Sequence, residues 1–364
     1  MKISVLLSLI VVSVVGLVGF QSCKNEVEIF APQNDVTVIY GLLNSDDTVH
    51  QFKINRVFQG ADAVANLAKD PTLSEYENIS ARLFELLGDG FGNFDTTNQW
   101  TLSERTITDK DSGYFYYPNQ KIYEVTANLN NHREYAVMVD KLDGSPIVES
   151  TTELIRVNGD ILIKPFGLNF LGLSLAGSNG PIEKIGLELK MPVNAKVIDV
   201  YLDFSWKDEF YSGATPIHHT ISYKVGTYLA TNIPTLDTDA EIIKADLNPT
   251  AFYEFIAANT SVVPNGSDLK QRVADDEPLN FRFVTGGDEF NTYLEVASPS
   301  TSLLETKPEY TNVTNGVGLF SCRSFNNKTA LMSKKSIVYL VDGEIMAGRR
   351  FCNYSNSTDP NYCF

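Results

Sequence analysis

One serine of this sequence lies in a segment that differs by a single residue from a known nucleophile motif. The segment is Gly172-Leu173-Ser174-Leu175-Ala176, and the motif is GxSxG, which places a serine on a tight turn between a strand and a helix. Ala176 replaces the second glycine, and no alternation of strand and helix patterns surrounds the segment. We therefore expect Ser174 to be an ordinary strand or loop serine.

Carboxylates at Asp237, Asp239 and Glu241 offer oxygen ligands for calcium. The glycine and the ligand spacing of an EF-hand loop are missing, so we interpret this stretch as a solvated acidic loop. The alternate glycines of residues 88–92 are spaced like a phosphate-binding loop, but no helix pattern follows them. We expect them to be turn glycines.

Two adjacent histidines, His218 and His219, are candidates for a metal ligand or a general base. No carboxylate lies at a diagnostic spacing from them, so exposed loop histidines are the favoured interpretation. The chain has 4 histidines and contains no CxxC, HxxxH or HExxH motif, which argues against structural zinc. The sequence therefore predicts no enzyme, no metal site and no cofactor.

Aromatic side chains at 114–117 and at Trp100 are the residues with the best case for ligand binding, because an aromatic face packs against the CH surface of a sugar ring. A strand of a β-sandwich produces the same residues, and we favour that core interpretation. The Gly-rich segment 312–318 is a second candidate, since loops often carry recognition. The candidate interaction surface comprises Tyr114, Tyr116, Tyr117, Trp100, Asn315 and Gly316.

The first residues of the chain have the pattern of a lipoprotein signal peptide. Lys2 precedes an apolar run, Ile3–Phe20, which ends at Ser22-Cys23. Cleavage after residue 22 would leave Cys23 first, and its acyl chains, a palmitate included, would hold the protein on a membrane at about 0.8 kcal/mol per buried CH₂. The alternative is an uncleaved transmembrane helix, because such a run can just span a bilayer.

Composition and charge narrow the class of partner. The chain has 29 Lys and Arg against 45 Asp and Glu, a net charge of −16, and such a surface repels nucleic acid. A length of 364 residues is more than one core usually serves, so we expect two domains. The 17 Tyr and 21 Phe favour strands.

Three cysteines remain if Cys23 is lipidated, and an exported protein meets an oxidising compartment. We expect one disulfide and one leftover thiol, with three pairings open. The stretch between Cys352 and Cys363 is rich in Asn, Ser, Asp and Pro, so it forms a loop that favours this pair. Cys322 lies on the same strand face as Phe320, which favours a buried thiol.

Residues 36–157 follow a short tether, 23–35, and contain period-2 runs separated by turn residues. Such runs are typical of half-buried antiparallel strands and predict an immunoglobulin-like sandwich. A short helix is expected at 60–68. The expected strands are 36–42, 50–58, 80–87, 123–129, 135–139 and 147–152.

Residues 158–364 alternate most clearly at 185–191 and 198–206, which predicts a larger antiparallel β-rich domain with one or two short helices. Asn248-Pro249 supplies an N-cap and a proline at the first helical position, so a helix is expected near 249–258. Further strands are expected at 279–285, 292–297 and 316–324, with a hairpin about Asp342-Gly343.

The ending Phe20–Cys23, followed by Glu26 and Glu28, resembles the lipoproteins that Bacteroidota export to the outer face of their outer membrane. In those proteins, acidic residues near the lipidated cysteine act as the export signal. Segments 38–58 and 312–320 resemble a group of uncharacterised envelope lipoproteins of the same bacteria. This resemblance implies an immunoglobulin-like N-terminal domain and a β-rich second domain, and it transfers no catalytic residue.

We expect a lipid-anchored outer-membrane protein that faces the cell exterior and binds rather than catalyses. The first interpretation is an accessory subunit of an outer-membrane protein complex for transport, secretion or barrel assembly. The alternative is a surface lipoprotein that binds a glycan or nutrient. The sequence leaves the partner, the leaflet and the oligomeric state open.

Overall fold

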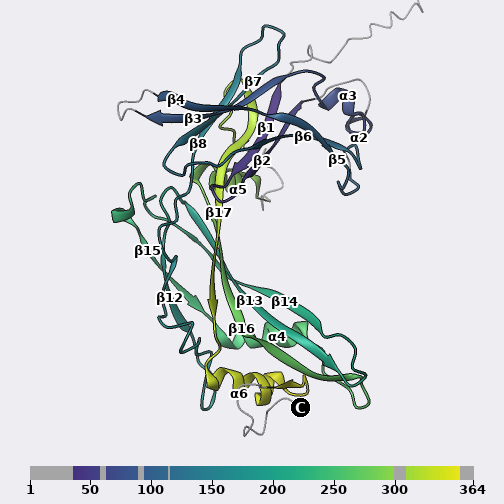
Figure 1. The fold of residues 1–364 in the computed structure, drawn as a ribbon, viewed down its shortest axis with the longest axis vertical. Helices are drawn as coiled ribbons and strands as arrows, with labels where there is room; N and C mark the ends of the chain where they lie inside the picture. The colour runs from purple at the N-terminus through teal and green to yellow at the C-terminus, as the bar shows by residue number, and fades with distance from the viewer. Residues whose placement is uncertain (1–35, 58–62, 89–93, 114, 299–308, 353–364) are drawn as a thin grey trace, which may run out of the picture.

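The computed structural model describes residues 36–57, 63–88, 94–113, 115–298 and 309–352. In Figure 1 these residues form two lobes, one above the other, joined at a narrow waist. Both lobes consist mainly of β-strands, most of them in antiparallel pairs, which confirms the mainly β fold class. The expected signal peptide, the tether and Cys23 lie outside the described residues.

The first lobe is built from eight strands: β1 (Thr37–Leu43), β2 (Val49–Arg56), β3 (Ser80–Gly88), β4 (Phe94–Thr101), β5 (Ser103–Ile107), β6 (Gln120–Thr126), β7 (Glu134–Asp140) and β8 (Val148–Glu153). One sheet has the order β1-β2-β6-β5 and the other β4-β3-β7-β8. These are the A-B-E-D and C′-C-F-G orders of an immunoglobulin-like sandwich. The predicted N-terminal fold is therefore confirmed.

Tyr135, at the start of β7, is buried in this sandwich and links β7 to β3 and to the loop before β7. Its fully buried hydroxyl accepts a hydrogen bond from the Asn130 backbone N–H at 2.7 Å and donates one to Glu85 Oε2 at 2.9 Å. A tyrosine bonded to the backbone a few residues upstream is the tyrosine corner of this fold. Burial and the Glu85 carboxylate raise the pKa of Tyr135, so the hydroxyl stays protonated.

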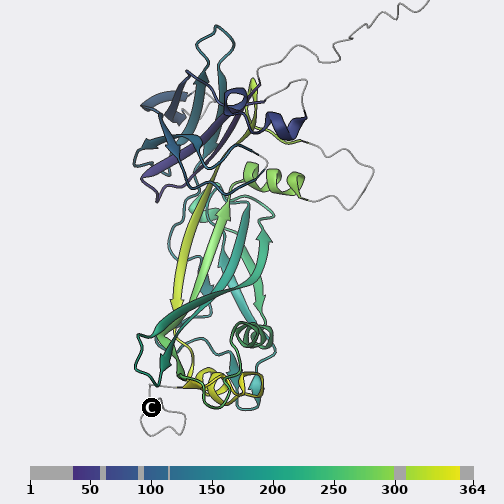
Figure 2. The ribbon, with the colours of Figure 1, turned by 90° about the vertical axis from the view of Figure 1, so that its right-hand side faces the viewer.

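A single long strand, β17 (Gly316–Ala330), belongs to both lobes. Its residues 316–322 pair in parallel with β1, and residues 323–330 pair antiparallel with β16 (Leu269–Gly286). Figure 2 shows this yellow-green strand running from the upper lobe into the lower one. One continuous sheet therefore spans the molecule.

Gly318 permits the parallel pairing of β17 with β1. Its φ angle is +121°, a value that residues with a side chain rarely adopt. A Cβ atom at this position would overlap the carbonyl oxygen of Ile39, its partner in β1. The attachment of β17 to the first lobe thus depends on one glycine.

This pairing corrects the expected domain division. A boundary at 157/158 assigned every later residue to the second domain, but residues 316–322 extend a sheet of the first sandwich. The alternation within 316–324 predicted a strand correctly. A local pattern carries no information on which distant edge a strand will join, and parallel pairing needs a long connection. The sequence pattern therefore did not predict that this strand is shared by both lobes.

The second lobe extends the long sheet and adds a second one. Its strands are β9 (Leu162–Lys164), β10 (Ala176–Gly177), β11 (Gly180–Pro181), β12 (Ile185–Lys190), β13 (Val197–Phe210), β14 (Ile217–Leu229), β15 (Ile242–Leu247), β16 and β18 (Phe351–Cys352). The order β14-β13-β16-β17 continues the shared sheet, β18 pairs with β16, and β15-β12-β9 form the second sheet. Leu202 and Phe204 point inward, as the alternation predicted.

The described helices are α2 (Val64–Leu67), α3 (Pro71–Ser74), α4 (Pro249–Asn259), α5 (Asp288–Ala297) and α6 (Lys334–Asp342), with 3₁₀ turns η1 (Asp237–Asp239) and η2 (Glu344–Met346). The helix expected near 249–258 is confirmed as α4. Asn248 Oδ1 accepts the Ala251 backbone N–H at 3.1 Å, and Pro249 occupies the first turn. Phe252 and Ile256 are fully buried.

Residues 292–297 were expected to be a strand and instead belong to α5. Asp288 and Glu289 in the first turn favour a helix electrostatically. Tyr293 packs edge to face on Tyr40 of β1, with ring centroids 6.0 Å apart. The β-prone composition of a short segment is therefore overridden by a contact with a distant strand.

The hairpin expected about Asp342-Gly343 is wrong as well. Asp342 ends α6, and the Gly343 N–H donates to the Tyr339 carbonyl at 2.8 Å. A glycine stops a helix as readily as it turns a hairpin. With α4, α5 and α6, the region after residue 157 contains three described α-helices rather than one or two.

The hydrophobic core continues through the waist. Ile39, Phe52 and Phe320 are buried in the first lobe, and Phe281 and Phe283 in the second. Residues of both lobes form one cluster of buried side chains. We therefore treat the two lobes as one packed body.

Candidate functional site

A pocket of about 200 Å³ lies over the outer face of β2, beside α3. Phe52 and Ile54 of β2 point into the sandwich, so the alternate residues Lys53 and Asn55 face outward. The pocket, hereafter the β2 pocket, is lined by Lys53, Asn55, Ala68, Ser74, Glu75, Lys110, Phe115, Tyr116, Asn119 and Gln120.

Two short helices form one wall of the β2 pocket. Of the helix expected at 60–68, residues 64–67 form α2, Ala63 is not helical, and residues 60–62 lie outside the described residues. Asp70 caps α3 by accepting the Thr72 N–H at 2.9 Å. Arg56 Nε of β2 donates to the Leu73 carbonyl at 3.0 Å, which holds α3 against the sheet.

The loop between β5 and β6 forms the opposite wall. The Tyr116 backbone N–H donates to the Ala68 carbonyl at 2.9 Å, so this loop is fastened to the end of α2. Lys110 Nζ donates to the Tyr116 carbonyl at 2.9 Å and lies 5.5 Å from the ring centroid of Phe115. The Phe115 side chain is 56% exposed, so an aromatic ring stands at the pocket rim.

Positive charge is crowded around the β2 pocket. Lys53 Nζ donates to the Lys121 carbonyl at 2.6 Å, and the nearest described carboxylate oxygen, on Glu75, is 4.0 Å away. Burial lowers the pKa of Lys53, Glu75 raises it in part, and the charges of Lys110 and Lys121 lower it further. An anion in the pocket would relieve this repulsion.

The pocket also contains a polar atom without a partner. Asn55 Oδ1 is buried and has no hydrogen-bond partner among the described residues. A buried acceptor normally has a donor from protein or water. Because this atom has almost no accessible surface, a ligand in the pocket would reach it only after the Asn55 side chain rotates.

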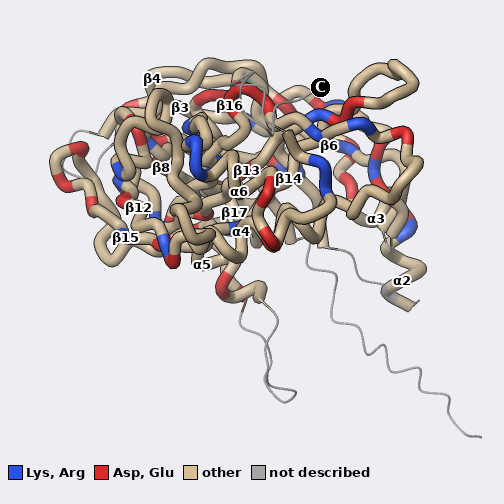
Figure 3. Tube along the Cα trace, turned by 90° about the horizontal axis from the view of Figure 1, so that it is seen from below, with Lys and Arg blue, Asp and Glu red and all other residues tan. Residues whose placement is uncertain are grey.

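A shallower groove of about 420 Å³ adjoins the β2 pocket and shares Lys53 and Gln120 with it. It crosses the outer faces of β1, β2 and β6 and reaches Arg323 of β17. We call the pocket and groove together the β2–β6 face. Its lining includes three basic residues, Lys53, Lys110 and Arg323, against two acidic ones, Glu75 and Asp47, on a chain of net charge −16. Basic residues are marked in blue near β6 in Figure 3.

The predicted aromatic residues separate in the structure. Tyr116 lines the β2 pocket and Tyr117 is exposed in the same loop, whereas Tyr114 lies outside the described residues. Trp100 of β4 lines a different, open pocket with Glu124 and Thr126 of β6, and its ring packs partly on the core. Trp100 therefore takes no part in the β2 pocket.

The predicted loop residues Asn315 and Gly316 hold the start of β17 against the first sandwich. Asn315 Nδ2 donates to the Ile147 carbonyl at 2.9 Å. A Cβ on Gly316 would meet the Thr37 carbonyl oxygen and Val148 at 2.7 Å each. These intramolecular contacts account for both residue types, and neither residue lines the β2 pocket.

The structure places the candidate serine and the candidate acidic stretch as follows. Ser174 is exposed in a segment without the strand-to-helix turn of the nucleophile motif. Glu241 accepts the backbone N–H groups of Thr231 and Asn232 at 2.8 and 3.1 Å, which lower its pKa. No group of three metal-ligating side chains occurs in the described part of the chain.

The expectation of loop histidines was wrong. His218 and His219 both lie in β14, because the strand begins at Ile217. The His219 ring stacks on Trp206, with centroids 5.0 Å apart, and its Nε2 is 3.4 Å from Asp208. His219 therefore belongs to a hydrophobic and ionic cluster of the second lobe, whereas its neighbour His218 is exposed.

The two described cysteines differ in state. Cys322 is a free, buried thiol, as expected, and Cys352 is disulfide-bonded. Cys363 lies outside the described residues, so its pairing with Cys352 stays a prediction. Among the described helices none is long and apolar enough to cross a membrane.

Sequence reasoning missed Lys53, Asn55 and Lys110. The first two were detectable, because period-2 alternation with buried Phe52 and Ile54 places them together on the outer face. Lys110 lies in a loop, and no local pattern links it to β2. Its position depends on how the β5–β6 loop folds back.

No protein-family model matches this chain, and no curated protein matches it. Among solved structures, it is similar to the C-terminal globular domain of an oligosaccharyltransferase from Pyrococcus abyssi, at 12% sequence identity and a TM-score of 0.25. The match covers 70% of this chain and 49% of that one, so the chain spans about half the length of that domain.

Proposed function

We propose that this protein is a lipid-anchored outer-membrane protein that binds a membrane-embedded complex as an accessory subunit, in transport, secretion or barrel assembly. Anchoring at Cys23 would confine it to the membrane and raise the effective concentration of any partner there. Only residues 24–36 separate that anchor from β1, so the tether would reach at most about 50 Å. The first lobe would then work close to the membrane surface.

The observation that supports this proposal is the character of the β2–β6 face. It carries exposed apolar side chains, with Tyr40 41% and Val49 44% exposed, beside Arg323. Tyrosine and arginine are among the residue types that dominate binding energy at protein interfaces. The groove is wide and shallow, which suits a protein surface better than a small molecule.

Site-specific photo-cross-linking in intact cells tests the proposal. A photoreactive residue replaces Val49 or Gln51 in the groove, and a matched control replaces Thr151, which is exposed on the other sheet of the sandwich. We expect cross-links to one outer-membrane protein from both groove positions and none from the control. Absence of cross-links at the groove, or equal cross-linking at Thr151, would overturn the proposal.

A second candidate function, capture of a saccharide, is favoured by the β2 pocket. This pocket combines the exposed Phe115 ring, Tyr116 and several amide and ammonium groups. Saccharides need both an apolar wall and hydrogen-bonding groups. The pocket is smaller than the groove and closed on two sides by α3 and the β5–β6 loop.

A further inference from the structure

We infer that the β2 pocket binds an acidic sugar, a ring that carries a carboxylate and free hydroxyls. The inference rests on the second candidate function, capture of a saccharide, and names the class of ligand. Two features of the pocket support it: two ammonium groups and an aromatic rim.

The ammonium groups of Lys53 and Lys110 select for the carboxylate. An ammonium has three N–H donors, and the described hydrogen bonds use one on each lysine, to the carbonyls of Lys121 and Tyr116. Lys110 makes no ion pair within the described chain, and Lys53 has only the Glu75 contact at 4.0 Å. A carboxylate would receive charge-assisted hydrogen bonds and offset the repulsion between the lysines.

Amide side chains supply hydrogen bonds for the hydroxyls. Asn119 and Gln120 line the pocket, and an amide group carries both donors and acceptors. A sugar hydroxyl, which both donates and accepts, is matched by such groups.

The size and walls of the pocket suit one ring. A volume of about 200 Å³ is below the roughly 300–1,000 Å³ of pockets that enclose drug-sized ligands. Phe115 and Tyr116 provide the apolar surface against which the CH face of a ring packs. Further sugars of a chain would lie in the adjoining groove, which begins at Gln120.

Inorganic phosphate is the competing anion. Phosphate sites use arginine forks, lysine ammonium groups or backbone N–H groups at the start of a helix, and they need no aromatic wall. The pocket has no arginine among its lining residues, and α3 has only 4 residues. Lysines with amides and aromatic rings fit a hydroxylated carboxylate better.

Calorimetric titration of the full chain in detergent tests the inference. The probes are the trisaccharide of galacturonate, the matched neutral trisaccharide of galactose, and inorganic phosphate. We expect the acidic sugar to bind at least tenfold more tightly than the neutral one, and phosphate not to compete. Competition by phosphate at equal strength would overturn the sugar assignment.

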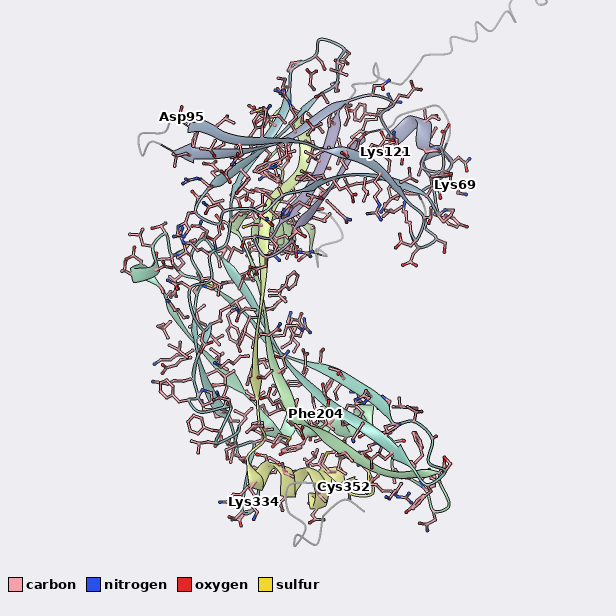
Figure 4. All side chains as sticks on the ribbon, in the orientation of Figure 1. Lys69, Asp95, Lys121, Phe204, Lys334 and Cys352 are labelled. Atoms are coloured by element: carbon pink, nitrogen blue, oxygen red, sulfur yellow. The ribbon has the colours of Figure 1, made fainter. Side chains whose placement is uncertain are left out.

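Two variants locate the binding. Lys110→Gln should weaken the acidic sugar at least tenfold and leave any weak neutral-sugar binding unchanged. The control is Lys334→Gln at the start of α6, which Figure 4 labels at the far end of the molecule from Lys121.

The outcomes separate this inference from the function on which it rests. Equal binding of acidic and neutral sugars, both lost in Phe115→Ala, would refute the acidic selectivity and keep saccharide capture. Failure of both sugars to bind would refute both. A loss of acidic-sugar binding in Lys334→Gln as large as in Lys110→Gln would remove the pocket from consideration.

Discussion

The two lobes expose outer faces of the same long sheet, but Lys110 at the β2 pocket and the basic side chains of the second-lobe face have different partners. In the second lobe Arg282 lies 3.2 Å from Asp203 and over the Tyr201 ring at 4.5 Å, and Lys224 Nζ is 3.0 Å from Asp199. In the first lobe Lys110 contacts a carbonyl and an aromatic ring, with no ion pair among the described residues.

This difference indicates which face is available for binding. A charged side chain that already has an ion-pair partner within the fold contributes little binding free energy, because the ligand must replace that partner. Charges held near carbonyls and rings keep unused donors, and a ligand carboxylate adds a contact. We therefore place recognition on the β2–β6 face and interpret the second-lobe face as a stabilised surface.

The comparison requires that the two lobes fold as one unit. The substitution Gly318→Ala should disrupt that unit most strongly. The substitution combines a strained φ angle with an overlap on the Ile39 carbonyl oxygen, so we expect a loss of about 3 kcal/mol or more in the free energy of unfolding. The matched control is Gly186→Ala in β12, where a Cβ meets nothing within 4 Å.

Fluorescence of the two tryptophans measures the unfolding of each lobe separately, since Trp100 lies in the first lobe and Trp206 in the second. Single-tryptophan proteins, made with Trp100→Phe or Trp206→Phe, should show one common urea midpoint. In Gly318→Ala the midpoint seen by Trp100 should fall below that seen by Trp206. Two separate midpoints without the glycine substitution would contradict the single-body description.

A second prediction concerns Cys322, the last residue of β17 that pairs with β1. Burial, and next the nearby Glu289 carboxylate, raise the pKa of this thiol to about 12. The unfolded thiol ionises near pH 9 whereas the folded one stays neutral, so stability is fully present below that pH and falls above it. Between pH 8.5 and 10 we expect a loss of about 1 kcal/mol.

Urea titrations at a series of pH values measure this loss, and Cys322→Ala should abolish the part due to the thiol. Ionisation of unfolded tyrosines adds to the slope within this window, because residues such as Tyr123 have a folded pKa raised to about 12 by burial and nearby acidic groups. The contribution of the thiol is therefore the difference between the two proteins. Rapid alkylation of Cys322 in the native protein at pH 8 would contradict its description as a buried thiol.

The smallest expected effect sharpens the contrast between the two faces. Arg282 is partly exposed, so Arg282→Leu should cost no more than about 1 kcal/mol in the free energy of unfolding. Sugar binding should be unchanged in Arg282→Leu and reduced in Lys110→Gln. Equal binding losses in the two variants would mean that the faces do not differ in the way described.

Much of the β structure could be predicted from local alternation, whereas the candidate site could be predicted only in part. Phe52 and Ile54 pointed inward as expected, which fixes Lys53 and Asn55 on the opposite face. Tyr116 was identified for its aromatic character, yet its place beside Lys53 depends on a hydrogen bond between its backbone and Ala68. Trp100 has the same character, but β4 carries it to a different pocket.

The sequence by itself determined which residues face inward along β2, β12 and β13, where α4 begins and that Cys322 is buried. These properties depend on side-chain periodicity and capping within a few residues. Tertiary structure decided that β17 joins β1 in parallel, that residues 292–297 form a helix, and that Lys110 reaches β2. Each of these depends on contacts between segments far apart in the chain, whose free energy no local pattern contains.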